Sequence, residues 1–337
     1  MDGLVSILGQ TVLSVRGAGS MVFAVIVARK YQMMDPWVLG CILWLAVVMV
    51  AHGLIRLNRW RMSRGSMHLA ANDTVVITGA SSGLGLYMTA ILAQKHRVVA
   101  LDIQQPAIPI TNVEYKKVDC SDEIRVQTVL EKINAACLIN CAGVAIPGTV
   151  QDISSKDFTK VMAVNFFAPT WATRALLPKM LANKRGYIVN IASSTALIGP
   201  RKAGAYAASK AALRTWHESL RRELQHTNVK MILVTPGQLD TPMFNSIKTP
   251  SRFLAPVLSC TKLGDKIISW LNAGYAGEIT APFYVGILGI AAATLPHSLL
   301  DILRDWNGLD KSMDDFTAAE KIRPKAPKSV YAEDNHK

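Results

Sequence analysis

The sequence predicts an α/β fold, in which a doubly wound and mostly parallel sheet follows an N-terminal transmembrane segment. Three observations support this prediction. From Thr74 onward, short apolar runs alternate with stretches of helical periodicity, which is the pattern of a parallel sheet covered by helices on both faces. A glycine-rich turn joins the first apolar run to the first helical stretch. A long uncharged apolar run precedes both of them.

The first predicted element is a transmembrane helix over about 37–57, within a membrane-anchoring region 1–68. Residues 36–55 carry no charge, and a helix over 37–57 would be about 31 Å long, close to the roughly 30 Å hydrocarbon core of a bilayer. A buried core helix is the alternative. The apolar stretch 4–28 either lies in the membrane interface or forms half of a hairpin. The basic residues that follow the span should keep the rest of the chain in the cytosol; they are Arg56, Arg59, Arg61 and Arg64.

The composition gives little support for other partners. The 337-residue chain has a formal net charge of +13, but most of its basic residues are spread among acidic neighbours. An anionic membrane surface is therefore a simpler partner than nucleic acid, which is not expected. The five cysteines show no zinc-ligand spacing and the seven histidines are scattered, so no metal site is predicted and the thiols should be reduced.

One domain is predicted over 69–318, followed by a loosely ordered tail at 319–337. The candidate strands are 74–78, 97–101, 113–118, 136–140, 186–192, 229–234 and 278–281. The candidate helices are near 84–95, 122–134, 154–182 and 204–226. In such a sheet, ligands bind outside the carboxyl ends of the strands, where the strand order reverses.

The loop Thr78-Gly-Ala-Ser-Ser-Gly-Leu-Gly85 lies between the first strand and the first helix. This is the place of the dinucleotide-binding turn in a Rossmann-like domain. Gly79 permits the tight turn, while Gly83 and Gly85 allow the backbone and a cofactor to approach closely, and the helix N-terminus would face a pyrophosphate. An ordinary glycine–serine turn is the alternative. The candidate cofactor contacts in this loop are Gly79, Ser81, Ser82, Gly83, Leu84 and Gly85.

Tyr206 and Lys210 are four residues apart in a helical pattern, and Ser193 lies thirteen residues before the tyrosine. The tyrosine and the lysine share a helix face, so the ammonium group is expected to lower the pKa of the phenol. A serine hydroxyl from the preceding strand can hold a substrate oxygen. Most Tyr–Lys pairs of this spacing are exposed neighbours without chemistry, so the prediction of proton transfer depends on the glycine loop upstream.

Together these motifs resemble the short-chain dehydrogenase/reductase family over roughly 73–283. Cys141 departs from the family pattern, which usually has an asparagine there, and this change is expected to loosen the end of the fourth strand. The plan of the chain is most similar to the membrane-bound retinol and 17β-hydroxysteroid dehydrogenase branch. The residues that match the family in order and spacing are the loop 78–85, Asp119, Asn140 to Gly143, Asn165, Ser193, Tyr206, Lys210 and Pro236-Gly237.

The resemblance implies a catalytic set of Asn165, Ser193, Tyr206 and Lys210. Tyr206 would take a proton from an alcohol, or return it in the reverse direction, and Ser193 would orient the alcohol oxygen. Lys210 would lower the pKa of Tyr206 and bind the nicotinamide ribose. Asn165 would hold a water that links Lys210 to solvent, with a hydrogen-bonded core asparagine as the alternative.

A nicotinamide cofactor is therefore expected, with NAD(H) favoured over NADP(H). Asp102 ends the second predicted strand, where a carboxylate can bind the ribose hydroxyls and repel a 2′-phosphate; a surface aspartate at a turn is the alternative. Asp119 would support the adenine pocket, while Ser121 or Asp122 caps the next helix. The further contacts that the resemblance implies are Asn140, Ala142, Gly143, Tyr206, Lys210, Pro236, Gly237 and Thr241.

An apolar substrate lid is predicted over 241–300, which is rich in apolar residues and has few charges. Residues 279–300 could instead be a core strand and helix, or a second membrane span. The expected function is membrane-bound hydride transfer between NAD(H) and a lipophilic alcohol, ketone or aldehyde of the retinoid, steroid or fatty-alcohol type. The alternatives are an NADPH-dependent ketoreductase of lipid biosynthesis and a non-catalytic, cofactor-binding membrane scaffold. The expected location is the endoplasmic reticulum or lipid-droplet membrane, and a homodimer is compatible with the sequence.

Overall fold

The computed structural model describes residues 68–313, except 107, 245, 248–254 and 309, and six isolated positions between 40 and 53. The chain divides into two compact units, Met1–Arg64 and Gly65–Lys337. Most of the predicted span 37–57 lies outside the described residues, as do the whole of the stretch 4–28 and the tail 319–337. Within the described part, no helix has both the length and the apolar character that a membrane crossing requires.

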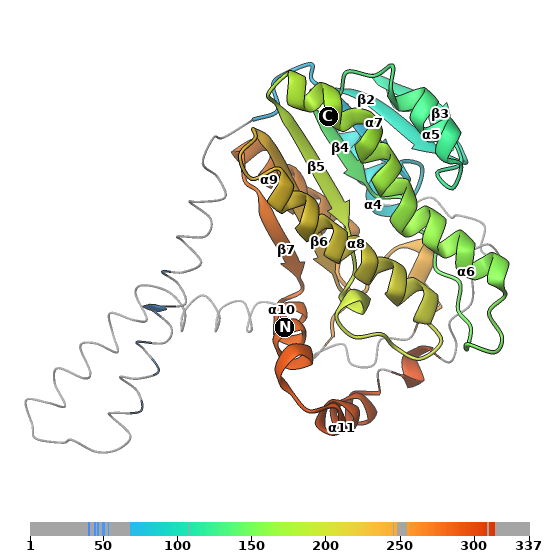
Figure 1. Ribbon diagram of the computed structural model, residues 1–337, viewed down its shortest axis with the longest axis vertical. Coiled ribbons are helices and arrows are strands. Elements are labelled where there is room, and N and C mark those ends of the chain that lie inside the picture. Colours follow the sequence, from blue (N-terminus) through green and yellow to red (C-terminus); the bar gives the residue numbers. More distant parts are fainter. Residues whose placement is uncertain are drawn as a thin grey trace, which may run out of the picture. The chain divides into compact units, whose positions relative to one another are not determined.

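The second unit is built on a seven-stranded sheet in which every pair of neighbouring strands is parallel (Figure 1). The strand order is β3-β2-β1-β4-β5-β6-β7. The chain therefore reverses its direction of travel across the sheet between β1 and β4, which confirms the predicted doubly wound sheet. The strands are β1 (Thr74–Thr78), β2 (Arg97–Asp102), β3 (Val113–Lys117), β4 (Cys137–Asn140), β5 (Gly186–Ile191), β6 (Val229–Pro236) and β7 (Gly277–Ala281).

Helices cover both faces of the sheet (Figure 1). One face packs against α4 (Gly83–Leu92) and α9 (Cys260–Ala273). The other face packs against α5 (Glu123–Leu130), α7 (Ala168–Ala182) and α8 (Gly204–Glu223). The remaining helical elements are α6 (Ser155–Met162), α10 (Phe283–Thr294), α11 (His297–Asn307), the π-helical turn η1 (Ala163–Phe167) and the 3₁₀ turns η2 (Ser194–Ala196), η3 (Pro242–Phe244) and η4 (Lys311–Met313).

The predicted strands all occur, with ends that differ by at most two residues, and the main departure lies in the long helical stretch 154–182. There, α6 and α7 are separated by the π-helical turn η1, a local widening of the helix that is frequent at functional sites. At α5 the structure decides between the two predicted caps, because Asp122 Oδ1 accepts the hydrogen bond from the Arg125 amide (3.0 Å).

Contrary to the prediction, 241–300 is not a continuous lid. Leu263, Ile267 and Leu271 recur along one face of α9, are at most 1% exposed, and pack into the core that α4 shares. Gly264 permits this packing, since a Cβ there would collide with the ring of Tyr87 on α4. Beyond α9 the chain forms β7 and then the 12-residue helix α10, which is the strand-and-helix alternative rather than a second span.

A chain of buried hydrogen bonds connects β4, β5 and α8. Asn140 Nδ2 donates to Asn190 Oδ1 (2.8 Å), and Asn190 Nδ2 lies 3.0 Å from His217 Nδ1. Because the Asn190 amide is the donor to the ring, His217 Nδ1 accepts and the imidazole is neutral. The three side chains are at most 2% exposed, and burial lowers the pKa of His217 to about 4.

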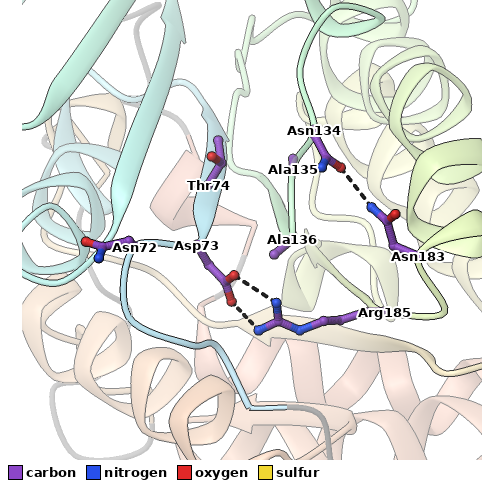
Figure 2. A pocket seen from close by; sticks show the side chains of 8 residues that line it. All are labelled: Asn72, Asp73, Thr74, Asn134, Ala135, Ala136, Asn183 and Arg185. Carbon is purple, nitrogen blue, oxygen red and sulfur yellow. Dashed lines mark hydrogen bonds and ion pairs between the residues drawn. The ribbon is translucent and has the colours of Figure 1, made fainter.

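The opposite edge of the sheet, at the amino ends of the strands, holds the start of the described domain. Asp73 forms an ion pair with Arg185, which also donates to the carbonyl of His68 (3.0 Å). Figure 2 shows this ion pair in a polar hollow of about 330 Å³, together with the hydrogen bond between Asn134 and Asn183. The hollow therefore lies at the end of the sheet away from the predicted site.

We expect His217→Gln to reduce the dependence of stability on pH. In the unfolded chain His217 titrates with its ordinary pKa of 6.5, whereas in the folded protein its pKa is about 4. Between these values the unfolded state binds more protons, so the free energy of unfolding of the wild type falls as the pH falls from about 6.5 toward about 4. The contribution of His217 to this fall is about 2 kcal/mol between pH 7 and pH 5.

Urea unfolding at the two pH values measures this contribution as the difference between the wild type and His217→Gln. His226→Gln is the matched control, because His226 is exposed just after α8 and should leave the pH dependence unchanged. An identical loss of stability in the wild type and in His217→Gln would contradict a buried, neutral His217.

Candidate active site

The predicted site residues gather where the strand order reverses. β1 ends at Thr78 and β4 ends at Asn140, and these two residues are paired in the sheet. The Thr78 hydroxyl accepts hydrogen bonds from the backbone amides of Cys141 and Ala142, both at 3.2 Å. The turn after β4 is thereby fixed to the end of β1, and the loosening expected from Cys141 stays a prediction.

The glycine loop requires glycine at two positions for steric reasons. Gly79 has a φ of +69°, and a Cβ there would lie 2.6 Å from the Cα of Ala142. A Cβ on Gly85 would overlap the carbonyl oxygen of Gly79. Gly85 therefore lets α4 pack against its own loop, so its steric role lies within the protein rather than against a cofactor.

The N-terminus of α4 has the properties of an anion-binding site. Its N-cap residue Ser82 makes no side-chain capping hydrogen bond, and its first turn contains no acidic residue. The first N–H groups of a helix lack intrahelical partners and favour negative charge. These features fit the pyrophosphate of a dinucleotide, with Ser81, Ser82 and Gly83 at the helix start. Leu84 packs its side chain into the core, which leaves its backbone for such a contact.

Asp102 contacts the glycine loop from the end of β2. Its carboxylate accepts hydrogen bonds from the backbone amides of Ser81 (2.9 Å) and Gln104 (3.1 Å). The carboxylate is thus beside the loop that fits a pyrophosphate, where a ribose-binding group is needed. Asp119 is exposed beyond the end of β3 and accepts hydrogen bonds from the amide (2.9 Å) and the hydroxyl (2.7 Å) of Ser121.

The structure brings Ser193, Tyr206 and Lys210 together beyond the end of β5. The Ser193 hydroxyl forms a hydrogen bond with the Tyr206 hydroxyl, which favours the phenolate and so acts to lower the pKa of Tyr206. Lys210 Nζ donates to the carbonyl of Ile191 (2.8 Å) and lies 5.8 Å from the centre of the Tyr206 ring. All three side chains are at most 7% exposed. The three residues that the spacing and the upstream glycine loop singled out are therefore buried together by the fold.

Burial dominates the electrostatics of this group. It raises the pKa of Tyr206 to about 12, in spite of the hydrogen bond from Ser193. It also lowers the pKa of Lys210 to about 8. The expected lowering of the Tyr206 pKa by Lys210 is therefore not what this structure shows, because burying a phenolate costs more than the nearby polar groups return.

Asn165 lies in η1 and is fully buried. Its Oδ1 accepts from the Val144 amide (2.8 Å), while its Nδ2 donates to the Val144 carbonyl (2.9 Å) and the Ser209 hydroxyl (3.0 Å). Both side-chain hydrogens are used, as in the alternative of a hydrogen-bonded core asparagine. A Cβ on Gly143 would lie 3.5 Å from Asn165 Oδ1 and 3.7 Å from Lys210 Nζ, so both polar groups flank this glycine. The water-holding role stays a prediction.

The other predicted contacts lie in the turns after β4 and β6. Thr241 is buried, and a Cβ on Gly83 would lie 3.0 Å from its methyl group, so the loop after β6 meets the glycine loop. Pro236 ends β6, and the Gly237 amide donates to the carbonyl of Ala281 (2.7 Å). These contacts place the loop after β6 at the same edge of the sheet as the glycine loop and the turn after β4.

Sequence reasoning missed Tyr284, which joins this edge from α10. Burial raises the pKa of Tyr284, while its hydroxyl interacts with the Ser194 side chain and the Gln238 backbone. A Cβ on Gly237 would overlap this hydroxyl, so glycine is needed there for the contact. No local pattern marks Tyr284, because its position depends on β7 bringing α10 to the ends of β5 and β6.

An apolar cluster packs around Tyr206, and the Phe244 ring meets the tyrosine ring edge-on with 6.1 Å between their centres. Of the predicted lid, only residues just after Thr241 contribute to this cluster. Its other members come from the turn after β4, from the loop before α6 and α6 itself, from the loop before α8 and its first turn, and from η4. The cluster consists of Val144, Ala145, Ile146, Ile153, Val161, Ala203, Ala205, Tyr206, Met243, Phe244, Ile247 and Met313.

The family model described as short chain dehydrogenase matches residues 73–251. The chain belongs to the short-chain dehydrogenase/reductase family. It is 35% identical over 257 residues to the uncharacterized oxidoreductase TDA5 of Saccharomyces cerevisiae, over 72% of this chain and 78% of TDA5. It is 33% identical over 172 residues to the 3-ketodihydrosphingosine reductase of Bacteroides thetaiotaomicron, over 50% of this chain and 64% of that protein.

A third relative is estradiol 17-beta-dehydrogenase 11 of Macaca fascicularis, which is 29% identical over 255 residues, 69% of this chain and 83% of the relative. This similarity agrees with the predicted retinol and 17β-hydroxysteroid dehydrogenase branch. Among solved structures, 4-hydroxyisoleucine dehydrogenase complexed with NADH matches with a TM-score of 0.55 and 27% identity, over 62% of this chain and 96% of that chain. The protein is an alcohol oxidoreductase of a family that uses nicotinamide cofactors.

We expect Thr78→Val to lower the free energy of unfolding by about 2 kcal/mol. The substitution keeps the shape of the side chain but removes the acceptor of two backbone amides. Each unsatisfied buried polar group costs about 1–3 kcal/mol, and the lower value applies because both hydrogen bonds are only partly buried. Thr89→Val is the matched control. The Thr89 hydroxyl is fully buried and has no hydrogen-bond partner among the described residues, so its removal should cost nothing. Urea unfolding compares the three proteins, and equal effects of the two substitutions would disprove the role of Thr78.

Proposed function

We propose that the protein is a membrane-bound oxidoreductase that transfers a hydride between NAD(H) and a lipophilic alcohol or the corresponding ketone or aldehyde. The observation that carries the proposal is the hydrogen-bonded pair of Ser193 and Tyr206, buried beside Lys210 and packed in an apolar cluster. A hydroxyl pair of this kind handles the proton of an alcohol, and the cluster around it favours an apolar substrate body.

The proposed roles use contacts that already exist. An alcohol oxygen that joins the Ser193–Tyr206 pair would accept a hydrogen bond from Ser193 and give its proton to Tyr206. The cofactor would be held by the α4 N-terminus, Asp102 and Lys210, and when bound it supplies the hydride acceptor or donor. Asn165 would act indirectly, because it fixes the turn after β4 to α8 through Val144 and Ser209.

The pKa values bear on the direction of the reaction. Burial favours the protonated phenol of Tyr206, with a pKa of about 12, and this is the form that donates a proton when a carbonyl group is reduced. Oxidation requires the phenolate instead. The ammonium group of Lys210, which is 5.8 Å from the ring centre, is well placed to stabilise that form. We therefore propose that Lys210 matters most for alcohol oxidation.

The surface of α10 and α11 supports a membrane-associated function. Phe283, Ile290 and Trp306 are between 67% and 75% exposed on these two helices, and large exposed apolar side chains often mark interaction sites. Both helices lie beyond the carboxyl ends of the strands (Figure 1). The segment that follows the predicted anchor is instead tied at the opposite edge through Asp73 and Arg185. α10 and α11, rather than that segment, are therefore proposed to bring the site to the endoplasmic reticulum or lipid-droplet membrane.

A lipid-biosynthetic ketoreductase that uses NADPH is the second candidate. The 33% identity to a 3-ketodihydrosphingosine reductase favours it, and so does a phenol that burial keeps protonated. The choice of cofactor separates the two candidates. The non-catalytic scaffold has little support, because family membership and the assembled Ser193, Tyr206 and Lys210 both point to an enzyme.

Tyr206→Phe should reduce turnover by about 10²- to 10⁴-fold while NADH still binds, because it removes the proton-transfer group and leaves the glycine loop intact. The measurement is NADH formation from a panel of long-chain, sterol and retinoid alcohols, with NADH binding followed by fluorescence. Tyr275→Phe is the control, since Tyr275 is exposed and packs on Trp270. Full activity in Tyr206→Phe would rule out the mechanism.

The wild type should bind NADH more tightly than NADPH, and the double substitution Asp102→Ala with Ile103→Arg should reverse the preference. The reason is that the Asp102 carboxylate repels a 2′-phosphate, whereas an arginine attracts it. Fluorescence titration with both cofactors gives the two Kd values for each protein. A wild type that prefers NADPH would disprove the role of Asp102 and favour the ketoreductase.

A further inference from the structure

The C-terminal turn η4 returns the chain to the cluster around Tyr206. Met313 is 6% exposed and belongs to the same packed cluster as Tyr206 and Phe244. α11 ends at Asn307 and is followed by Gly308, whose φ of +71° lets the chain turn back after the helix. A segment beyond the predicted lid therefore contributes to the wall around the proposed proton-transfer group.

Asp310 holds this turn against the loop that leads into α8. Its Oδ1 accepts a hydrogen bond from the Arg201 amide (2.8 Å), and its two oxygens lie 3.1 and 3.2 Å from Arg304 Nη2. Arg304 also donates to the carbonyl of Gly199 (3.0 Å). Although burial raises the pKa of Asp310, the Arg201 amide and Arg304 keep it below its ordinary value. The loop that positions Tyr206 thus also positions Met313.

We infer that Met313 limits the size of the apolar group that the site accepts beside Tyr206, and that Asp310 positions Met313 for this task. The inference rests on the proposed function of the site and adds to it a residue that determines substrate specificity. Met313 touches the apolar part of the substrate, whereas Asp310 acts only through the turn that carries Met313.

Burial of the reacting groups is the reason to expect such a limit. Tyr206 and Ser193 are each 7% exposed, so the side chains around them must shift to admit an alcohol. Met243 and Met313 can shift most easily, because an unbranched thioether adapts to irregular shapes. Val161 is β-branched and sits on the regular helix α6. Met313 lies on the single 3₁₀ turn η4. Its displacement would therefore require less rearrangement of the backbone than displacement of Val161.

The alternative is that Met313 merely fills the core next to Tyr206. Its truncation would then lower stability and affect all substrates alike. A size limit makes a different prediction, because the space left by truncation can be occupied by a longer substrate. The two explanations are therefore separated by the relative reaction rates of long and short substrates rather than by activity itself.

The experiment compares kcat/KM for dodecan-2-ol and butan-2-ol, with NAD⁺ and the full chain in one detergent. Met313→Ala should raise the ratio of the long to the short alcohol about tenfold, because several further CH₂ groups can be buried. Met313→Phe should lower the ratio by a similar factor. Met88→Ala is the matched control: it makes the same truncation in the separate core that α4 forms with the sheet and should leave the ratio unchanged.

The role of Asp310 is tested with Asp310→Ala and its matched control Asp305→Ala, which removes an exposed carboxylate from the same region of the chain. Asp310→Ala should raise the ratio in the same direction as Met313→Ala, and Asp305→Ala should not. The double variant Asp310→Ala/Met313→Ala should show no more than the effect of Met313→Ala alone, since one residue acts through the other. NADH should bind all variants with the wild-type Kd.

If Met313→Ala and Met313→Phe leave the ratio of kcat/KM for the two alcohols unchanged while turnover continues, the inference is overturned but the proposed function is not. If the wild type oxidises neither alcohol, the proposed function fails, and binding decides the inference. In that case the Kd of dodecan-2-ol for the NADH complex, followed by NADH fluorescence, should still decrease in Met313→Ala. An unchanged Kd of dodecan-2-ol in Met313→Ala, or no binding in any variant, would reject the inference about Met313.

Discussion

The pairing of β1 with β4 is the constraint on which the rest of the site depends. All seven strands are parallel, so their carboxyl ends collect at one edge, and the reversal between these two strands separates the loops that follow them. Thr78 then fixes the turn after β4 by accepting hydrogen bonds from two of its amides. The glycine loop, the Asn140 turn and the first turns of α8 all take their positions from this arrangement.

Burial is the second general feature, and it affects chemistry and specificity together. Burial raises the pKa of Tyr206 and lowers that of Lys210, and the cluster that packs around Tyr206 is apolar. In the proposed function the same side chains would contact the body of a substrate, so the surroundings of Tyr206 would favour an apolar alcohol as well as shift the pKa of the phenol. The cluster around Tyr206 combines the flexible thioether side chains of Met243 and Met313 with the aromatic ring of Phe244. This combination would allow related substrates of different shape to fit.

The sequence predicted those parts of the structure that local patterns determine. The strands were readable as short apolar runs, and Ser193, Tyr206 and Lys210 as residues at fixed spacing. The helix α9 was not predicted, because its apolar residues were interpreted as part of a lid. The orientation of Asn165 depends on a π-helical turn, and the contributions of Tyr284 and Met313 depend on long-range return of the chain. Burial also raises the pKa of Tyr206, whereas the spacing of Tyr206 and Lys210 predicted that it would be lowered. Spacing could not reveal how deeply the fold buries the phenol.

Direct hydride transfer between the substrate and the cofactor is tested by following the hydrogen on the carbinol carbon. Dodecan-2-ol deuterated at that carbon is incubated with the full chain and NAD⁺, and the reduced cofactor is analysed by mass spectrometry. Direct hydride transfer predicts one deuterium in each NADH formed and none released to the solvent. Unlabelled NADH, or deuterium in the solvent, would contradict direct hydride transfer at this site.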